Sequence, residues 1–242
     1  MKPTPTSPLS ILAFGAHPDD IEFGCGGVIA RETQAGNAAC FVVCSRGESA
    51  TNGTPARRVK EAREAARLLG ATIEFVDLGG DAHFEVRVAS AVKLAAIIRR
   101  VRPLIVLAPT PVEDQHPDHA VLSRLVRDAA RLARYGGIKE LRSRPAHAIG
   151  SLVFYAITPE AEPTGLTKVL IDVSAPAVRA AWTAAMETHG SQASTRKYVE
   201  LQLTRARLHG LCSGVDYAIP LFANDPPVLQ SLEQLGRGQR RF

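Results

Sequence analysis

The stretch Ser10–Asp20, SILAFGAHPDD, decides the fold class of this chain. Residues 10–15 are apolar or small throughout, and this continuous pattern predicts a strand that is buried on both faces. The polar turn His17–Asp20 follows directly and leads into a helical segment. A strand buried on both faces belongs to a parallel sheet with helices packed against each side.

The first two-thirds of the chain repeats this alternation of strand and helix. We therefore expect an α/β fold, with a Rossmann-like, doubly wound, mainly parallel sheet of core order 3-2-1-4-5 and helices on both faces. The further strands are predicted at residues 38–44, 72–78, 104–108 and 151–157, and the helices at residues 21–35, 55–69, 86–101 and 119–135.

The last third continues this domain as a C-terminal α/β extension. A strand is predicted at residues 168–173, and helices at 176–188 and 196–211. No linker or internal repeat separates them from the rest, so we expect one domain over residues 1–242, with residues 1–8 as a flexible tail.

Composition excludes several classes of function. The 242 residues carry a net charge of +5, with 45% hydrophobic and 22% charged residues, and the charges are scattered apart from short pairs such as Arg57-Arg58 and Arg99-Arg100. We interpret these pairs as solvated surface, and no nucleic-acid-binding module is visible. The four cysteines form no CxxC pair and are expected to be buried thiols. No apolar run approaches the roughly 20 residues that span a bilayer. We therefore expect a cytoplasmic protein without nucleic-acid or membrane partners.

A second polar cluster, His116-Pro117-Asp118-His119, follows the predicted fourth strand. In a sheet of order 3-2-1-4-5, strands one and four are neighbours, and ligands bind beyond their carboxyl ends. The fold rule therefore brings His17–Asp20 and His116–His119 together from distant parts of the sequence.

The combined cluster has the residues that a mononuclear zinc hydrolase needs. We predict His17, Asp20 and His119 as zinc ligands, which leaves one position for water. Asp19 is then free to act as the general base. His116 is predicted to steady the oxyanion and to protonate the leaving amine as a protonated imidazole.

Asp118 is predicted to orient the ring of His116. Each cluster alone has a simpler interpretation, because His-Pro-Asp segments are common in turns and Asp19 or Asp20 could cap the helix that follows.

The glycine-rich stretch Gly24–Gly27 does not fit a dinucleotide fingerprint, because those glycines belong in the turn after the first strand. We interpret them as a site of close packing between helix and sheet.

Several segments together resemble the LmbE-like (PIG-L) family of zinc-dependent N-acetylglucosamine deacetylases. The similar segments are AHPDD at 16–20, GESATNG at 47–53, Arg58 and Glu61 with the helix ending Leu69-Gly70, HPDH at 116–119, THGSQ at 188–192 and GVDYA at 214–218.

The resemblance implies hydrolysis of the N-acetyl group of an N-acetylglucosamine conjugate, and the same zinc ligands and base. It further implies that Arg58 and Asp81 contact sugar hydroxyls, with Glu48 and Asn52 nearby, although Asp77 lies close to Asp81 in sequence.

The resemblance also implies a homo-oligomer, a trimer or hexamer, and Zn²⁺ as the cofactor, with another divalent metal such as Fe²⁺ as the alternative. Within the family, the SATNG loop and the phrase EDQHPDH are most similar to bacillithiol-pathway enzymes acting on N-acetylglucosaminyl malate. The segment Ile219-Pro220-Leu221 departs from their pattern and is expected to border the site. His189 either lines the pocket or caps the helix before it.

Two alternatives stay open at this point. The site could deacylate another acylated amine, such as an antibiotic or a chitin fragment, or the fold could be a non-catalytic nucleotide- or sugar-binding module.

Overall fold

One mixed sheet forms the centre of the molecule. The computed structural model describes residues 9–113, 116–194 and 197–234, so the predicted tail at residues 1–8 lies outside the described residues. Its seven strands have the order β3-β2-β1-β4-β5-β7-β6, which confirms the predicted core order 3-2-1-4-5. The first five strands are parallel, and β7 runs antiparallel to both β5 and β6. The strands are β1 (Ser10–Gly15), β2 (Ala38–Val43), β3 (Thr72–Phe75), β4 (Ile105–Pro109), β5 (Ser151–Tyr155), β6 (Thr167–Asp172) and β7 (Ala218–Ala223).

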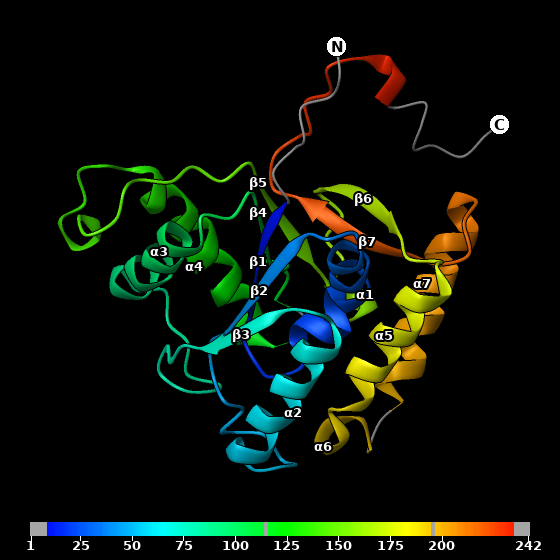
Figure 1. The fold of residues 1–242 in the computed structure, drawn as a ribbon. Helices are drawn as coiled ribbons and strands as arrows, with labels where there is room; N and C mark the ends of the chain where they lie inside the picture. The colour runs from blue at the N-terminus through cyan, green and yellow to red at the C-terminus, as the bar shows by residue number, and fades with distance from the viewer. Residues whose placement is uncertain (1–8, 114–115, 195–196, 235–242) are drawn as a thin grey trace.

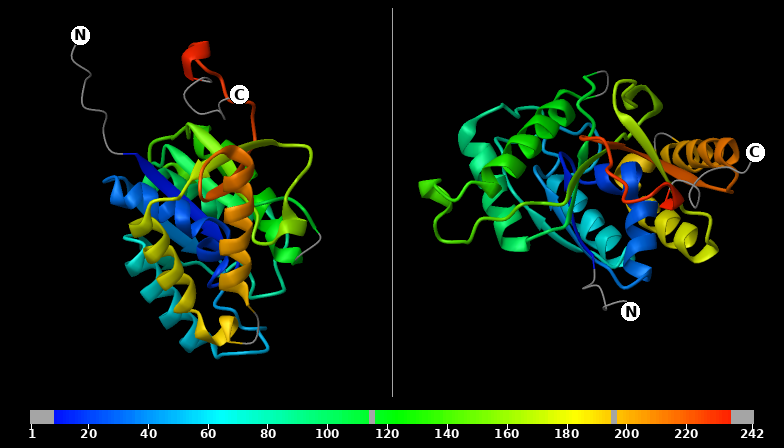
Figure 2. Two further views of the ribbon diagram at one scale, coloured as in Figure 1. Left: turned by 90° about the vertical axis from the view of Figure 1, so that its right-hand side faces the viewer. Right: turned by 90° about the horizontal axis from the view of Figure 1, so that it is seen from above.

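Helices cover both faces of the sheet (Figures 1 and 2). Ile11 and Ala13 of β1 pack into one apolar cluster with α1, α2, α5 and α7, while Leu12 and Phe14 pack into a second cluster with α3 and α4. Successive side chains of a strand point to opposite faces, so one apolar run supplies two cores. The helices are α1 (Asp20–Gln34), α2 (Pro55–Leu68), α3 (Val88–Val101), α4 (Pro117–Arg134), α5 (Pro176–Glu187), α6 (Gly190–Ala193) and α7 (Tyr198–Ser213), with single 3₁₀ turns at Lys139–Leu141 and Pro159–Ala161. None of the described helices is long and apolar enough to traverse a bilayer.

The glycines of α1 allow close packing, as the sequence predicted. A Cβ atom on Gly24 would lie 2.1 Å from Cδ2 of Tyr155, and one on Gly26 would lie 2.8 Å from Cδ1 of Trp182. Hydrogen bonds hold both aromatic side chains in place, since Tyr155 donates to the carbonyl of Phe14 and Trp182 to that of Glu22. The glycines therefore bring α1 against the sheet and α5, and they fix the start of the helix near the end of β1.

Among the described strands, β7 is the one that the sequence did not predict. Ile219, Pro220 and Leu221 lie within it, buried between β5 and β6, so the expectation that they border the site was wrong. A proline inside a short apolar run argues against a central strand, which is why the local pattern does not predict one here.

Two predictions about solvent exposure also need correction. Arg99 is only 2% exposed and donates to the carbonyls of Ala133, Tyr135, Leu141 and Arg144, so it anchors the end of α4 and the following loop. All four cysteines are free thiols, as predicted, and Cys25 and Cys44 are buried, but Cys40 is half-buried and Cys212 is exposed.

Candidate active site

The two polar clusters meet at the carboxyl ends of β1 and β4. These strands are paired in register, with Ile11 opposite Ile105 and Ala13 opposite Leu107. The turn after β1 and the first turn of α4 therefore face one another, and Nδ1 of His17 lies 3.3 Å from Nε2 of His119.

Three buried side chains form a site of the size that a small cation needs. Nε2 of His119 lies 3.1 Å from Oδ1 of Asp20, and Nδ1 of His17 lies 3.6 Å from Oδ2 of the same carboxylate. Zinc bonded tetrahedrally at 2.0–2.1 Å requires ligand atoms about 3.3 Å apart. His17, Asp20 and His119 are 7%, 4% and 6% exposed, and their spacing and donor types fit a divalent metal.

Asp20 is fixed by the turn that carries it. Its Oδ2 accepts hydrogen bonds from the backbone amides of Ala16 and His17, at 2.8 and 2.9 Å. These bonds hold the carboxylate at the mouth of β1 and leave Oδ1 directed at His119.

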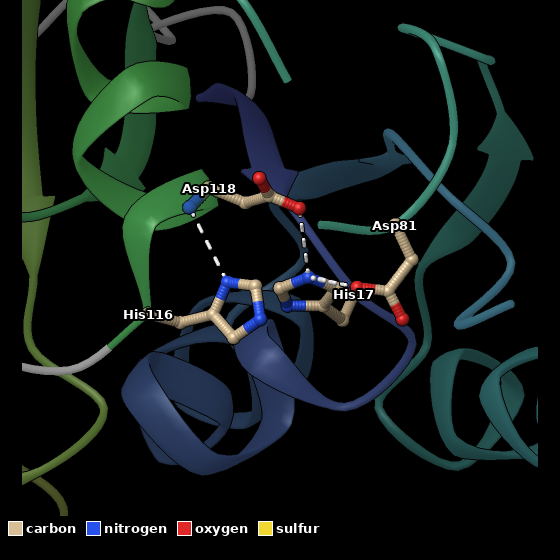
Figure 3. Close-up of side chains that lie close together, drawn as sticks. All are labelled: His17, Asp81, His116 and Asp118. Carbon is tan, nitrogen blue, oxygen red and sulfur yellow. Dashed lines mark hydrogen bonds and ion pairs between the residues drawn. The ribbon is translucent and has the colours of Figure 1, made fainter. Parts of the chain in front are cut away.

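The other ring nitrogen of His17 lies between two carboxylates (Figure 3). Nε2 of His17 is 3.0 Å from Oδ1 of Asp81 and 3.3 Å from Oδ2 of Asp118. Asp118 also accepts from the backbone amides of Ala82 and Phe84, and Asp81 from that of Ser49. Carboxylates that bind the second nitrogen of a ligating histidine orient its ring and raise its basicity.

The position of Asp118 corrects one prediction. Its carboxylate binds His17, whereas only its backbone amide reaches His116, donating to Nδ1 at 3.2 Å. Asp118 is therefore placed to orient the ring of His17 rather than that of His116.

Charge near His17 is dominated by these carboxylates. Burial favours the neutral imidazole, but Asp20, Asp118 and Asp81 outweigh it and raise the pKa of His17 well above its ordinary value. Asp20 is also buried, yet the neighbouring histidines hold the pKa of its carboxyl well below the usual range. When a metal cation replaces the proton on His17, the neutral imidazole and the ionised carboxylate of Asp20 together form a negatively charged set of ligands.

His116 caps the first turn of α4, where its Nδ1 accepts the hydrogen bond from Asp118. An accepting Nδ1 places the proton of a neutral ring on Nε2. Burial, together with the nearby His17 and His119, lowers the pKa of His116. The arrangement favours a neutral ring that donates from Nε2, rather than the imidazolium that the sequence predicted.

Asp19 is strained and does not cap the helix. It has a φ of 134°, rare for a residue other than glycine, and its side chain makes no capping hydrogen bond to α1. Oδ2 instead lies 3.2 Å from Nη2 of Arg58. Burial raises the pKa of Asp19 to about 6, although Arg58 opposes this effect. The carboxylate that the sequence predicted as a base is thus free of any structural role in α1.

Arg58 is a buried residue of α2, not a surface one. It is 4% exposed and donates to the carbonyl of Pro18 as well as to Asp19. A Cβ atom on Gly47, whose φ is 72°, would lie 2.0 Å from Nη1 of Arg58. Glycine is therefore required in this loop so that the guanidinium can lie against the backbone.

The cluster lies in a cavity of about 840 Å³. The predicted residues that line it are His17, Asp19, Asp20, Arg58, Asp81, His116 and His119. Its other walls include Ser49, Ala50, Thr51 and Gln192, which lie in the segments GESATNG and THGSQ that carried the family resemblance. Sequence reasoning missed the remaining wall residues, which are Phe23, Ala82, Ile157, Thr158, Lys197, Tyr198 and Leu201. Of these, Phe23 could have been found, because it lies three residues after Asp20 and so on the same face of α1.

Other predicted residues lie outside this lining. Glu48 accepts from the backbone amides of Arg46 and Asp81, and Asn52 is exposed and binds Gln192 through its carbonyl. Asp77 caps the turn at residues 79–80, so Asp81 is the one of the two that reaches the site. His189 neither lines the cavity nor caps a helix with its side chain. It is fully buried, with Nε2 3.5 Å from Oε1 of Glu22.

Comparison with known proteins finds a family match over the part of the chain that carries both polar clusters. Residues 12–130, which include both polar clusters, match the model of the family described as PIG-L, GlcNAc-PI de-N-acetylase. A solved structure of the conserved protein TT1542 from Thermus thermophilus is 34% identical and has a TM-score of 0.80, with 92% of this chain and 97% of that chain covered.

Curated relatives point to two activities. The 4-oxalmesaconate hydratase of Pseudomonas putida is 33% identical over 142 residues, which cover 54% of this chain and 55% of the relative. The diacetylchitobiose deacetylase of Thermococcus kodakarensis is 28% identical over 158 residues, which cover 60% of this chain and 59% of the relative. The chain thus spans little more than half the length of these relatives.

Proposed function

Because the chain belongs to the PIG-L family, we propose that it is a metal-dependent N-deacetylase, which hydrolyses the acetamido group of an N-acetylglucosamine conjugate to acetate and a free amine. The observation that carries this proposal is the convergence of a His17–Asp20–His119 ligand set with Asp19, a neighbouring carboxylate that neither binds the set nor caps the helix.

The metal would be held by His17, Asp20 and His119. When bound, a divalent ion supplies Lewis acidity, which activates water and polarises an amide carbonyl. Zinc suits a site of two imidazoles and one carboxylate, and Fe²⁺ is the alternative to compare with it.

Asp19 acts as the general base in this proposal. It takes a proton from the attacking water, and the hydrogen bond from Arg58 at 3.2 Å keeps the carboxylate oriented. Because the proton must next reach the amine, the protonated carboxyl of Asp19 is also a donor for the leaving nitrogen.

His116 stabilises the charge that develops on the carbonyl oxygen. Its ring lines the cavity, and an Nε2–H group can donate to an oxyanion without a net charge on the ring. Asp118 takes no part in this step and acts on His17.

Arg58 and Asp81 are proposed to contact the hydroxyls of the sugar, with Glu48 and Asn52 close by. Both Arg58 and Asp81 line the cavity but also bind other site residues, so their effect on substrate passes partly through Asp19 and His17. N-Acetylglucosaminyl malate is the conjugate suggested by the sequence resemblance, and it belongs among the first substrates to test.

Hydration of a carbon–carbon double bond is a second candidate, because the relative from Pseudomonas putida is a hydratase. The same metal site and base could add water to an unsaturated carboxylate. Such a substrate carries several carboxylates and needs cationic partners, whereas Asp19 and Asp81 line the cavity beside the metal ligands.

Metal analysis and two product assays test the proposal. Protein loaded with zinc or Fe²⁺ should release acetate from N-acetylglucosamine conjugates, and chelation should abolish release. Stoichiometric metal without acetate from any acetylated amino sugar, combined with water addition to 4-oxalmesaconate, would establish the hydratase instead.

A further inference from the structure

One side of the site cavity is apolar, and the mechanism does not use it. Phe23, Ile157, Tyr198 and Leu201 line this side of the 840 Å³ cavity. We refer to these four side chains as the apolar wall. A volume of this size is typical of pockets that enclose a ligand larger than one sugar ring.

Three separate elements build the apolar wall. Phe23 projects from the first turn of α1, Ile157 follows β5, and Tyr198 and Leu201 lie one turn apart at the start of α7. The rings of Phe23 and Tyr198 are 5.6 Å apart. Phe23 and Ile157 are buried, while Leu201 is 37% exposed, so the wall runs from the floor of the cavity to its rim.

The cations along the cavity are already engaged. Among the lining residues that the structure describes, these are Arg58 and Lys197. Arg58 donates to Asp19 and to the carbonyl of Pro18, and Lys197 pairs with Glu200 at the surface, where its side chain is 86% exposed. Neither offers a buried, unpaired site for a carboxylate.

The floor of the cavity also disfavours an anion. Besides Asp20, whose charge the metal would neutralise, it contains the carboxylates of Asp19 and Asp81, and these two disfavour a dicarboxylate held nearby. An uncharged aglycone avoids this repulsion, and an apolar one also covers the surface that Leu201 exposes.

We propose that the apolar wall is a subsite for the aglycone, and that the preferred substrate is an N-acetylglucosamine glycoside with an uncharged alkyl or aryl group. This inference rests on the proposed deacetylase function, because the acetamido group must lie at the metal ligands for the aglycone to reach the wall.

The first experiment compares three substrates that differ only in the aglycone: the methyl, phenyl and malyl glycosides of N-acetylglucosamine. The phenyl glycoside should have at least about a tenfold higher kcat/KM than the methyl glycoside, through a lower KM, because one more ring leaves water. The malyl glycoside should do no better than the methyl one. A malyl glycoside that surpasses the phenyl glycoside would overturn the proposal.

Two variants in α7 test whether the apolar wall causes the preference for the phenyl glycoside. Leu201→Ser should remove most of the advantage in kcat/KM that the phenyl glycoside has over the methyl glycoside. Leu208→Ser is the matched control, since Leu208 is 61% exposed on the same helix but does not line the cavity. Equal losses in the two variants would contradict a role for the wall.

A binding measurement separates the subsite from the reaction. Calorimetric titration with the phenyl and methyl glycosides of glucosamine, which carry no acetyl group, needs no turnover. Tighter binding of the phenyl compound, lost in Leu201→Ser, would support the subsite even if no acetate were released in any assay. Equal binding of both compounds would refute the subsite even in an active deacetylase.

Discussion

Removing both carboxylates that flank His17 should weaken metal binding far more than removing either one. Nε2 of His17 carries one proton and lies 3.0 Å from Asp81 and 3.3 Å from Asp118. Either carboxylate alone can therefore accept this proton and hold the ring. We expect Asp81→Asn and Asp118→Asn to weaken zinc binding about threefold each, and the double variant about 100-fold, the upper range for such outer contacts.

The corresponding free energies are about 0.7 kcal/mol for each single variant and about 2.7 kcal/mol for the double variant. The coupling of more than about 1 kcal/mol arises because the two acceptors substitute for one another. Asparagine at position 81 keeps an oxygen acceptor for the backbone amide of Ser49. At position 118 it keeps one for only one of the amides of Ala82 and Phe84, because these bind different oxygens of Asp118, so this variant also loses one backbone hydrogen bond.

Competition with a chromophoric chelator at neutral pH measures the affinities, and circular dichroism checks that each variant is folded. Asp77→Asn is the control, because Asp77 is exposed and, among the described hydrogen bonds, its side chain accepts only from the amides of Gly79 and Gly80 in its own turn. Strictly additive losses in the double variant, or an equal loss in Asp77→Asn, would show that the two carboxylates do not share the task of holding His17.

Three further outcomes are expected. Asp19→Asn should keep its zinc content but lose about 10²–10⁴-fold in turnover, since the general base is removed; a variant with wild-type turnover would exclude Asp19 as the base. Gly24→Ala should lower the free energy of unfolding in urea by at least about 2 kcal/mol, because its Cβ would lie 2.1 Å from the ring of Tyr155. Glu162 is partly buried, but its bonds to Lys168 and His209 and its ion pair with Arg205 lower its pKa to about 2. Its stabilising effect should be complete above its ordinary pKa of 4.5 and disappear as the pH falls towards 2. Urea unfolding of the wild type and Glu162→Gln across this range should therefore converge at low pH; a difference that does not change with pH would contradict the ion-pair explanation.

The sequence predicted most of the fold because local patterns and topology agreed. The continuous apolar run at residues 10–15 and its repeats give a parallel sheet, and the strand order follows from the rule for doubly wound sheets. The exception, β7, contains Pro220 and pairs antiparallel with two strands that the chain forms earlier. Such a pairing depends on long-range contacts, which a local pattern does not contain.

The metal cluster could be predicted for the same reason, since both motifs follow neighbouring strands. The sequence could not predict which side chains within the cluster bind one another. Asp118 was expected at His116 because the two are close in sequence, yet its side chain points to His17, 101 residues away. The direction of a side chain at a helix start depends on the loop packed against it, here the backbone amides of residues 82 and 84.

The sequence likewise did not predict the burial of Arg58 and Arg99, because an arginine next to another arginine suggests solvent exposure. Only the folded structure shows that Arg99 donates to four backbone carbonyls, and Arg58 to the carbonyl of Pro18 and the carboxylate of Asp19.

The position of β7 also dictates when the protein can be completed during synthesis. β6 pairs only with β7 among the described strands, and α5 and α7 lie between them in the chain. Residues 218–223 must therefore leave the ribosome before β6 can pair with β7 and before α7 can pack against β7. Until that moment, the nascent chain carries a parallel core whose edge at β5 is open, and the side of the cavity formed by α7 is the last to be assembled.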